Sequence, residues 1–263
     1  MFVSSNYAGR LCLLLCVVTL LCSCVPSKKM IYFPDTNFNT EELTTIHNKA
    51  GSYKLQPQDI VSVRIKTLDT ESSEYFNLQP NNSMLNVNQL SVYLNSYSID
   101  SEGLIMLPEI GAVKVGGFTV AEAQDKIQEA VGVYLNKANI VVKLVSFKIT
   151  VLGEVKHPGH FYIYNNQANV LEGLGMAGDL TDFGNRGNIT LLRQTEQGVG
   201  AVLIDLKDPK LLSSEFFYLQ PNDVLYVQPL RAKARRGNVG TFSTLSVLFG
   251  AVSTTILILN YLK

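Results

Sequence analysis

The chain has 263 residues with 22 basic and 22 acidic side chains, and charged residues make up 17% of it. A formal net charge of zero gives no global reason to expect a nucleic acid or another highly charged partner. The three histidines, His47, His157 and His160, leave little material for metal or acid–base chemistry, so we predict neither a metal nor a cofactor.

The N-terminal 24 residues combine an apolar run with all four cysteines of the chain. Leu11–Leu21 fits the apolar region of a signal peptide and is too short to cross a bilayer as a helix. Leu21-Cys22-Ser23-Cys24 resembles a bacterial lipobox, which implies a signal peptide at 1–23 and a lipid on Cys24. The folded part then contains neither a disulfide framework nor a thiolate metal site. By its resemblance to lipoprotein sorting rules, Val25 after the cysteine favours the outer membrane, with the body of the chain expected in the periplasm.

Residues 24–50 are polar and aperiodic, which indicates a tether between the lipid and the first domain. Tyr53–Ile65 alternates like a strand and is interrupted by the turn Gln56-Pro57-Gln58-Asp59. The polar stretch 69–95, rich in Asn and Ser, is expected to be a long loop or insertion.

Residues 97–115 contain short apolar runs separated by turn residues, which predicts a hairpin and a further short strand. Thr119-Val120-Ala121-Glu122 is a capping box, so a helix should begin at Val120 and continue to about residue 135. Ala138–Leu144 is then a β-branched strand.

The second half repeats this order. Phe147–Val155 is predicted to be a strand, followed by a turn and a returning strand at Phe161–Tyr164. Val170–Met176 is a short helix that Gly178 is placed to end. Further strands are expected at Ile189–Arg193 and Ala201–Leu206. One helix among short strands, twice over, predicts an α+β fold of two small β-grasp-like modules.

An internal repeat links the two halves. Residues 53–63 and 217–227 share Leu-Gln-Pro-x-Asp, each followed by an apolar strand that ends in Val. Proline fixes φ at the second position of a turn, and Asp can accept a local backbone N–H. We interpret the repeat as a turn that starts a strand, without chemistry of its own.

Together these stretches resemble the bacterial polysaccharide export family. Its opening motif is similar to Tyr53–Val63, its core motif to Tyr97–Ala123, and the start of its SLBB module (soluble-ligand-binding β-grasp) to Val151–Gly159. The resemblance implies an export domain at 51–146 and an SLBB domain at 147–229. It also implies a homo-oligomeric ring through which a capsular polysaccharide or exopolysaccharide passes, with an inner-membrane co-polymerase, often linked to a tyrosine kinase, as partner. The best-known members carry two SLBB modules, whereas this length allows one, and the insertion at 69–95 has no place in the motif.

The C-terminal end combines a basic linker with an uncharged stretch. The linker, 230–239, places four cations where they could contact anionic lipid head groups: Arg231, Lys233, Arg235 and Arg236. Residues 240–262 are predicted to form a transmembrane helix, because the 22 residues Thr241–Leu262 carry no charge and span about 33 Å. Basic residues on the periplasmic side oppose the positive-inside rule, which favours the outer over the inner membrane.

Small residues form a stripe on this helix, namely Ser243, Ser246, Gly250, Ser253 and Asn260. They could make contacts between helices of a ring or line its lumen, or they could be the ordinary content of a single-pass anchor. Both interpretations stay open.

Two other functions are compatible with the sequence. One is a membrane-tethered SLBB module that holds a glycan without exporting it, and the other is an inner-membrane structural partner of the polymerising machinery. An enzyme is not predicted, because no nucleophile with its base and no nucleotide-binding lysine is present. His157 and His160 flank a Pro-Gly turn without a nearby Cys, and we do not expect them to bind a metal.

Overall fold

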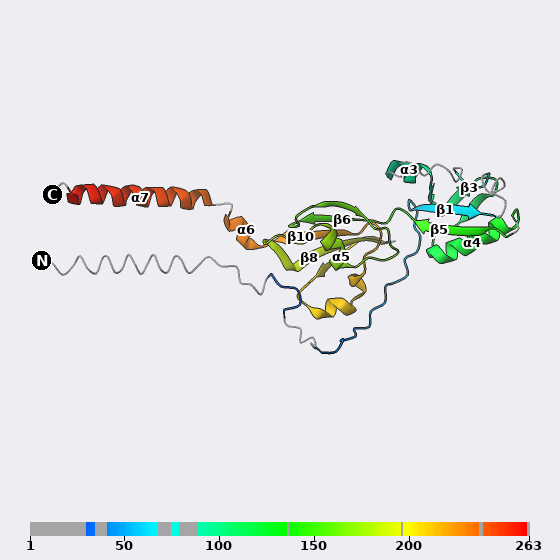
Figure 1. Cartoon of the computed structure of the whole chain (residues 1–263), viewed down its shortest axis with the longest axis horizontal. Coiled ribbons are helices and arrows are strands. Elements are labelled where there is room, and N and C mark those ends of the chain that lie inside the picture. The colour runs from blue at the N-terminus through cyan, green and yellow to red at the C-terminus, as the bar shows by residue number, and fades with distance from the viewer. Residues whose placement is uncertain are drawn as a thin grey trace.

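The computed structural model of the chain describes residues 30–34, 41–67, 75–78, 89–135, 137–195, 197–236 and 239–261 (Figure 1). The predicted signal peptide and Cys24 lie outside these residues, as do the side chains of Arg235, Arg236, Ser243 and Asn260.

The first module, residues 53–144, has a three-stranded antiparallel sheet in the order β2-β1-β5. Its strands are β1 (Ile60–Lys66), β2 (Tyr97–Ser98) and β5 (Asn139–Leu144), and a separate hairpin is formed by β3 (Leu104–Leu107) and β4 (Gly111–Lys114). The alternating burial along β1 places Val61, Val63 and Ile65 in one core. This hairpin and the short strand that precedes it were predicted.

Helix α4 (Val120–Gly132) begins where the capping box predicted. The Thr119 hydroxyl accepts the Glu122 amide, and the Glu122 carboxylate accepts the Thr119 amide at 2.8 Å. Two amides that the helix leaves unpaired are thereby satisfied. Ala123, Ile127 and Val131 are buried at helical spacing, so α4 covers the core of this module.

The second module, residues 147–229, has a five-stranded sheet in the order β7-β6-β10-β8-β9. The strands are β6 (Lys148–Gly153), β7 (Gly159–Tyr162), β8 (Gly184–Thr195), β9 (Gly198–Ile204) and β10 (Val224–Pro229). β10 lies parallel to β6 and antiparallel to β8. Strands β8 and β9 are each longer than predicted. They pair with each other from Ile189, opposite Ile204, to Thr195, opposite Gly198.

Helix α5 (Val170–Met176) has the predicted bounds and begins with a second capping box, between Asn169 and Glu172. It packs on the sheet through Gly173, where a Cβ would lie 2.8 Å from side chains of Ile149 and Leu219. Two short 3-10 helices, η2 (Pro209–Ser213) and η3 (Glu215–Phe217), precede the second copy of the repeat. The α+β class is thus confirmed, while the finer β-grasp assignment stays a prediction.

The prediction of a loop over 69–95 was wrong for its last part. Residues 89–94 form helix α3 (Gln89–Leu94), and Leu90, Tyr93 and Leu94 are exposed on it. The polar composition of the stretch hid this short apolar segment, which is too short to show a helical period.

The C-terminal predictions need two corrections. The predicted basic linker contains a helix that was not predicted, α6 (Arg231–Arg236). Helix α7 (Val239–Tyr261) is present at the predicted position. Within the part of the chain that the structure describes, however, no helix is long and apolar enough to cross a membrane. The described middle of α7 carries Ser253, Thr254 and Thr255, whose hydroxyls donate to backbone carbonyls within the helix.

Candidate functional site: the joint between the modules

The two copies of Leu-Gln-Pro-x-Asp fold into matching turns. In the first, the Asp59 amide donates to the Gln56 carbonyl at 3.1 Å, and Gln58 has φ +73°. In the second, the Asp223 amide donates to the Gln220 carbonyl at 3.2 Å, and Asn222 has φ +66°. Proline at the second position and a positive φ at the third define a type II turn. The sequence predicted the turns, but not that both aspartates would be buried, with 2% and 0% exposed.

Each aspartate accepts the first amide of its own turn. An Asp59 carboxylate oxygen lies 2.9 Å from the Gln56 nitrogen, and an Asp223 oxygen lies 2.7 Å from the Gln220 nitrogen. This bond closes the turn a second time, through the side chain. A buried carboxylate therefore locks the backbone that leads into β1 and β10.

The other partners of Asp59 are hydroxyl groups. The Tyr53 hydroxyl donates to it at 2.7 Å, and the Ser146 hydroxyl donates at 3.2 Å. Burial raises the pKa of Asp59 above its ordinary value of 3.8, while its hydrogen bonds from Gln56, Tyr53 and Ser146 act in the opposite direction. The ion pairs of the described residues include none at Asp59, so its charge is balanced by dipoles alone.

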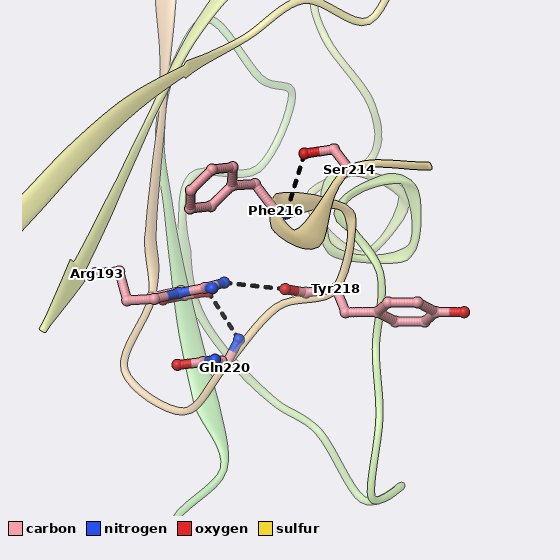
Figure 2. Close-up of polar contacts among 6 residues, drawn as sticks. Arg193, Ser214, Phe216, Tyr218 and Gln220 are labelled. Carbon is pink, nitrogen blue, oxygen red and sulfur yellow. Dashed lines mark hydrogen bonds and ion pairs between the residues drawn. The ribbon is translucent and has the colours of Figure 1, made fainter. Parts of the chain in front are cut away.

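Asp223 is instead paired with a cation. The Arg193 guanidinium donates to both carboxylate oxygens, at 3.0 and 2.7 Å. Its Nη2 also donates to the Tyr218 carbonyl at 2.9 Å, as Figure 2 shows. The Phe216 ring lies over the guanidinium at 5.9 Å. Burial raises the pKa of Asp223, and the hydrogen bonds from Arg193 and Gln220 oppose that rise. The same turn thus uses two hydroxyls in one module and a forked ion pair in the other.

The short connection between the modules, residues 145–147, is hydrogen-bonded to the first module, and the second turn bonds the residue that follows the connection. The Val145 amide donates to the Ile60 carbonyl at 2.9 Å, and the Ser146 hydroxyl accepts the Ile60 amide at 3.1 Å. On the other side, the Asn222 amide donates to the Lys148 carbonyl at 2.8 Å. We call the two turns and this connection the joint.

The joint is also apolar at its centre. Leu144 packs against the cores of both modules, and Phe147 is buried in the second. Burial, with the nearby Asp59, raises the pKa of the Tyr53 hydroxyl, and the Asp223 carboxylate adds to the rise across the joint. The two modules are therefore connected by a hydrogen-bonded, partly buried segment and not by a free linker.

The residues Arg193 and Ser146 were not singled out from the sequence. Arg193 ends an apolar strand run, Ile189–Leu192, where a cation that borders a core often has a buried partner. That signal could have suggested an ion pair, but its partner is 30 residues away in the sequence. Nothing local marks Ser146, which lies 87 positions from Asp59.

One of the four cations predicted in the basic linker forms an ion pair. Lys233 pairs with Glu154, whose carboxylate also accepts the Thr181 hydroxyl at 2.8 Å. The Lys233 ammonium is the main cause that holds the pKa of Glu154 below its usual range. This pair fastens α6 to the second module, and Arg231 is exposed beside it. Of the predicted stripe, Ser246, Gly250 and Ser253 are exposed along α7.

The histidine pair does not converge. The Nδ1 atom of His160 lies 2.9 Å from the Thr150 hydroxyl on the neighbouring strand, whereas His157 packs against Gly178. Across the described residues, no group of three or more His, Cys, Asp or Glu side chains is placed to hold a metal ion. Of the buried charged side chains among the described residues, Asp59 and Asp223 lie in the joint, where they hold the backbone of the two turns.

Two family models match the chain, one on each side of the connection between the modules. Residues 47–145 match the family described as polysaccharide biosynthesis/export protein, and residues 148–202 match the SLBB domain. The chain belongs to the polysaccharide export family. The boundary between the matched segments of this family member falls at the joint, and the matches end before β10 and the second turn.

Two relatives are named as polysaccharide export proteins of the outer membrane. The chain is 29% identical over 108 residues to the EPS I polysaccharide export outer membrane protein EpsA of Ralstonia nicotianae, over 40% of this chain. It is 30% identical over 107 residues to the protein of that name from Ralstonia solanacearum, over 39% of this chain. In each case the match spans 28% of the relative's length.

Proposed function

We propose that this export-family chain is a structural subunit of an outer-membrane assembly through which a polysaccharide leaves the cell. The family match and the names of its relatives support the substrate class and the membrane. Copies form a closed ring, and a capsular polysaccharide or exopolysaccharide passes through its centre. An inner-membrane co-polymerase delivers the polymer, and the lipid on Cys24 holds the ring to the membrane.

The joint is the observation that carries this proposal. A ring of identical copies closes only if each copy presents its two contact surfaces at one fixed angle. Two modules on a free linker would sample many angles, whereas here the connection is hydrogen-bonded to the first module through Val145 and Ser146 and is buried in the second through Phe147. A subunit of fixed shape is what a wall element requires.

Two further assignments belong to this proposal. Arg231, Arg235 and Arg236 contact anionic head groups, with Lys233 contributing less because Glu154 neutralises it. The stripe of small residues on α7 lies between helices of adjacent copies, where small side chains allow close backbone approach. Gly250→Leu should then reduce the amount of assembled ring while leaving both modules folded.

A deletion strain tests the function, and imaging tests the assembly. The expected result of deletion is polymer trapped in the periplasm, and normal surface polysaccharide would refute the proposal. The detergent-extracted chain should appear as a closed ring by electron microscopy, and a density gradient should place it with the outer membrane. A monomer in detergent would refute the ring, and an inner-membrane fraction would favour a structural partner of the polymerising machinery.

One observation favours a second function, that of a glycan-holding module. The sheet of the second module has α5 and the core on one face, so its other face is open. A row across four strands on that face consists of Leu152, Tyr226, Thr190 and Leu203. Aromatic and hydroxyl groups without charge suit a neutral sugar chain. Binding of purified polysaccharide that is lost in Tyr226→Ala, with normal export in the same strain, would favour this function.

A further inference from the structure

The segment that precedes the first module lies on the second module. The Tyr32 hydroxyl donates to the Asp179 carboxylate, and the Tyr32 side chain packs against the second core. One residue later, the Phe33 amide donates to the Leu206 carbonyl at 3.1 Å. These contacts join residues that are far apart in the sequence.

Arg186 makes the contact with Tyr32 specific. Its side chain is buried, with 6% exposed, and its Nε and Nη1 atoms have no hydrogen-bond partner among the described residues. The guanidinium carbon lies 5.3 Å from the centre of the Tyr32 ring. A cation over an aromatic face is stabilised by the ring's negative potential, more so where water is excluded. Tyr32 thus covers a buried charge that the second module leaves otherwise unpaired.

A second contact follows before the chain leaves this module. The Asn48 side-chain amide donates to the carbonyls of Leu212 and Ser214, at 2.7 and 3.1 Å. In Figure 1 the described segment passes beside the second module and then enters the first at β1. The predicted tether therefore touches the second module at two places.

We propose that Tyr32 is a latch that fixes the lipid anchor to the second module. The part of this proposal that concerns height above the membrane rests on the acylation of Cys24 in the proposed function. Cys24 and Tyr32 are eight residues apart, a reach of at most about 28 Å, whereas Cys24 and Tyr53 are 29 apart, a reach of about 100 Å. Without the latch, the next contact with the second module is Asn48, 24 residues from Cys24 with a reach of about 85 Å, so the latch shortens this reach about threefold.

Hydrogen exchange on the full-length chain in detergent tests the latch itself. In Tyr32→Ala the Phe33 amide should exchange at least tenfold faster, while amides of β8 and β10 keep their wild-type rates. Tyr164→Ala is the matched control, because Tyr164 is on the same module and 96% exposed. An unchanged Phe33 amide in Tyr32→Ala would overturn the latch.

The same measurement on Cys24→Ser separates this idea from the lipid anchor. The latch needs no lipid, so Phe33 should stay protected in the unacylated chain. Loss of membrane attachment with an intact latch would then concern the anchor alone.

Energy transfer tests whether the latch shortens the reach between the lipid anchor and the second module. The protein with Asp182→Cys, labelled with a donor, is placed in phosphatidylethanolamine–phosphatidylglycerol vesicles that contain an acceptor lipid. Transfer should fall when Tyr32→Ala is added and hold when Tyr164→Ala is added. Equal transfer in all three proteins would overturn the claim that the latch sets the height of the second module.

Discussion

The matched turns allow the same substitution to be made twice with different expected outcomes. Asp→Asn removes one negative charge at either position and keeps the size of the side chain. At Asp223 the new amide group must face Arg193, which has only donors, so no rotation restores both bonds. At Asp59 the partner hydroxyl of Ser146 can turn and accept.

The magnitudes follow from burial. Asp223 is fully buried and the Arg193 side chain is 15% exposed, so Asp223→Asn leaves an uncompensated cation in the second module. Breaking such a pair from one side costs about 3–5 kcal/mol, which corresponds to roughly a hundred- to several-thousand-fold in an opening equilibrium. Asp59→Asn exchanges one hydrogen bond for another and should cost about 1 kcal/mol or less.

Hydrogen exchange on the full-length chain reads the two modules separately, which a single unfolding curve would not. Asp223→Asn should accelerate exchange in β8 and β10, and Asp59→Asn should leave β1 and β5 within about tenfold of wild type. The double variant Arg193→Leu/Asp223→Asn should exchange more slowly than Asp223→Asn alone, because it no longer buries a lone cation. Equal effects of the two single substitutions would refute the assignment of different partners to the two turns.

Three other predictions concern single residues. Because burial raises the pKa of Asp59 above 3.8, the unfolded chain loses its proton first, so the free energy of unfolding of the first module falls as the pH rises from 3.8 through the folded-state pKa. Hydrogen exchange of β1 and β5 in wild type and in Asp59→Asn should therefore diverge across that window, and a constant ratio of the two rates would contradict this. Lys233→Ala should speed exchange across Arg231–Arg236 and leave the second core unchanged, since a half-exposed ion pair contributes at most about 1 kcal/mol; unchanged exchange in α6 would count against the fastening. Gly153→Ala should destabilise the second module by at least about 1 kcal/mol, because φ is +89° and a Cβ would overlap a backbone carbonyl oxygen. Gly200→Ala, with its nearest atoms at 3.7 Å, is the control, and equal hydrogen exchange of β6 and β10 in the two variants would contradict the strain.

The elements that could be predicted are those whose signals are local. The start of α4 follows from a capping box within four residues, and the end of α5 at Met176 is followed two residues later by Gly178, whose φ of +74° suits glycine. The repeated turn is likewise contained in one short motif. Its role could not be predicted, because the groups that complete it, Ser146 and Arg193, come from distant parts of the chain.

The tether and the C-terminal helix make contacts that their composition could not predict. Composition marks residues 24–50 as aperiodic, and the described residues 30–34 and 41–50 lie in no helix or strand. A single tyrosine that contacts a residue 147 positions away, however, has no periodic signal. Hydropathy marks the last helix as uncharged, yet the described part of α7 is rich in hydroxyl groups that bond to their own backbone. In both cases the composition gave the character of the segment and not its contacts.

The joint also explains why a buried aspartate is kept in each turn, although burial disfavours its charge. A carboxylate can accept the turn's own amide and two further donors at once, which a neutral amide side chain matches only where its partner can also accept. In the first module those donors are Tyr53 and the connecting Ser146, so the turn and the connection are held by one group. In the second module the donor is Arg193, which also bonds the Tyr218 carbonyl ahead of the turn. The cost of burying each charge is thus offset by fixing several backbone segments together, and a fixed angle between the modules is the property that a closed ring of identical subunits needs.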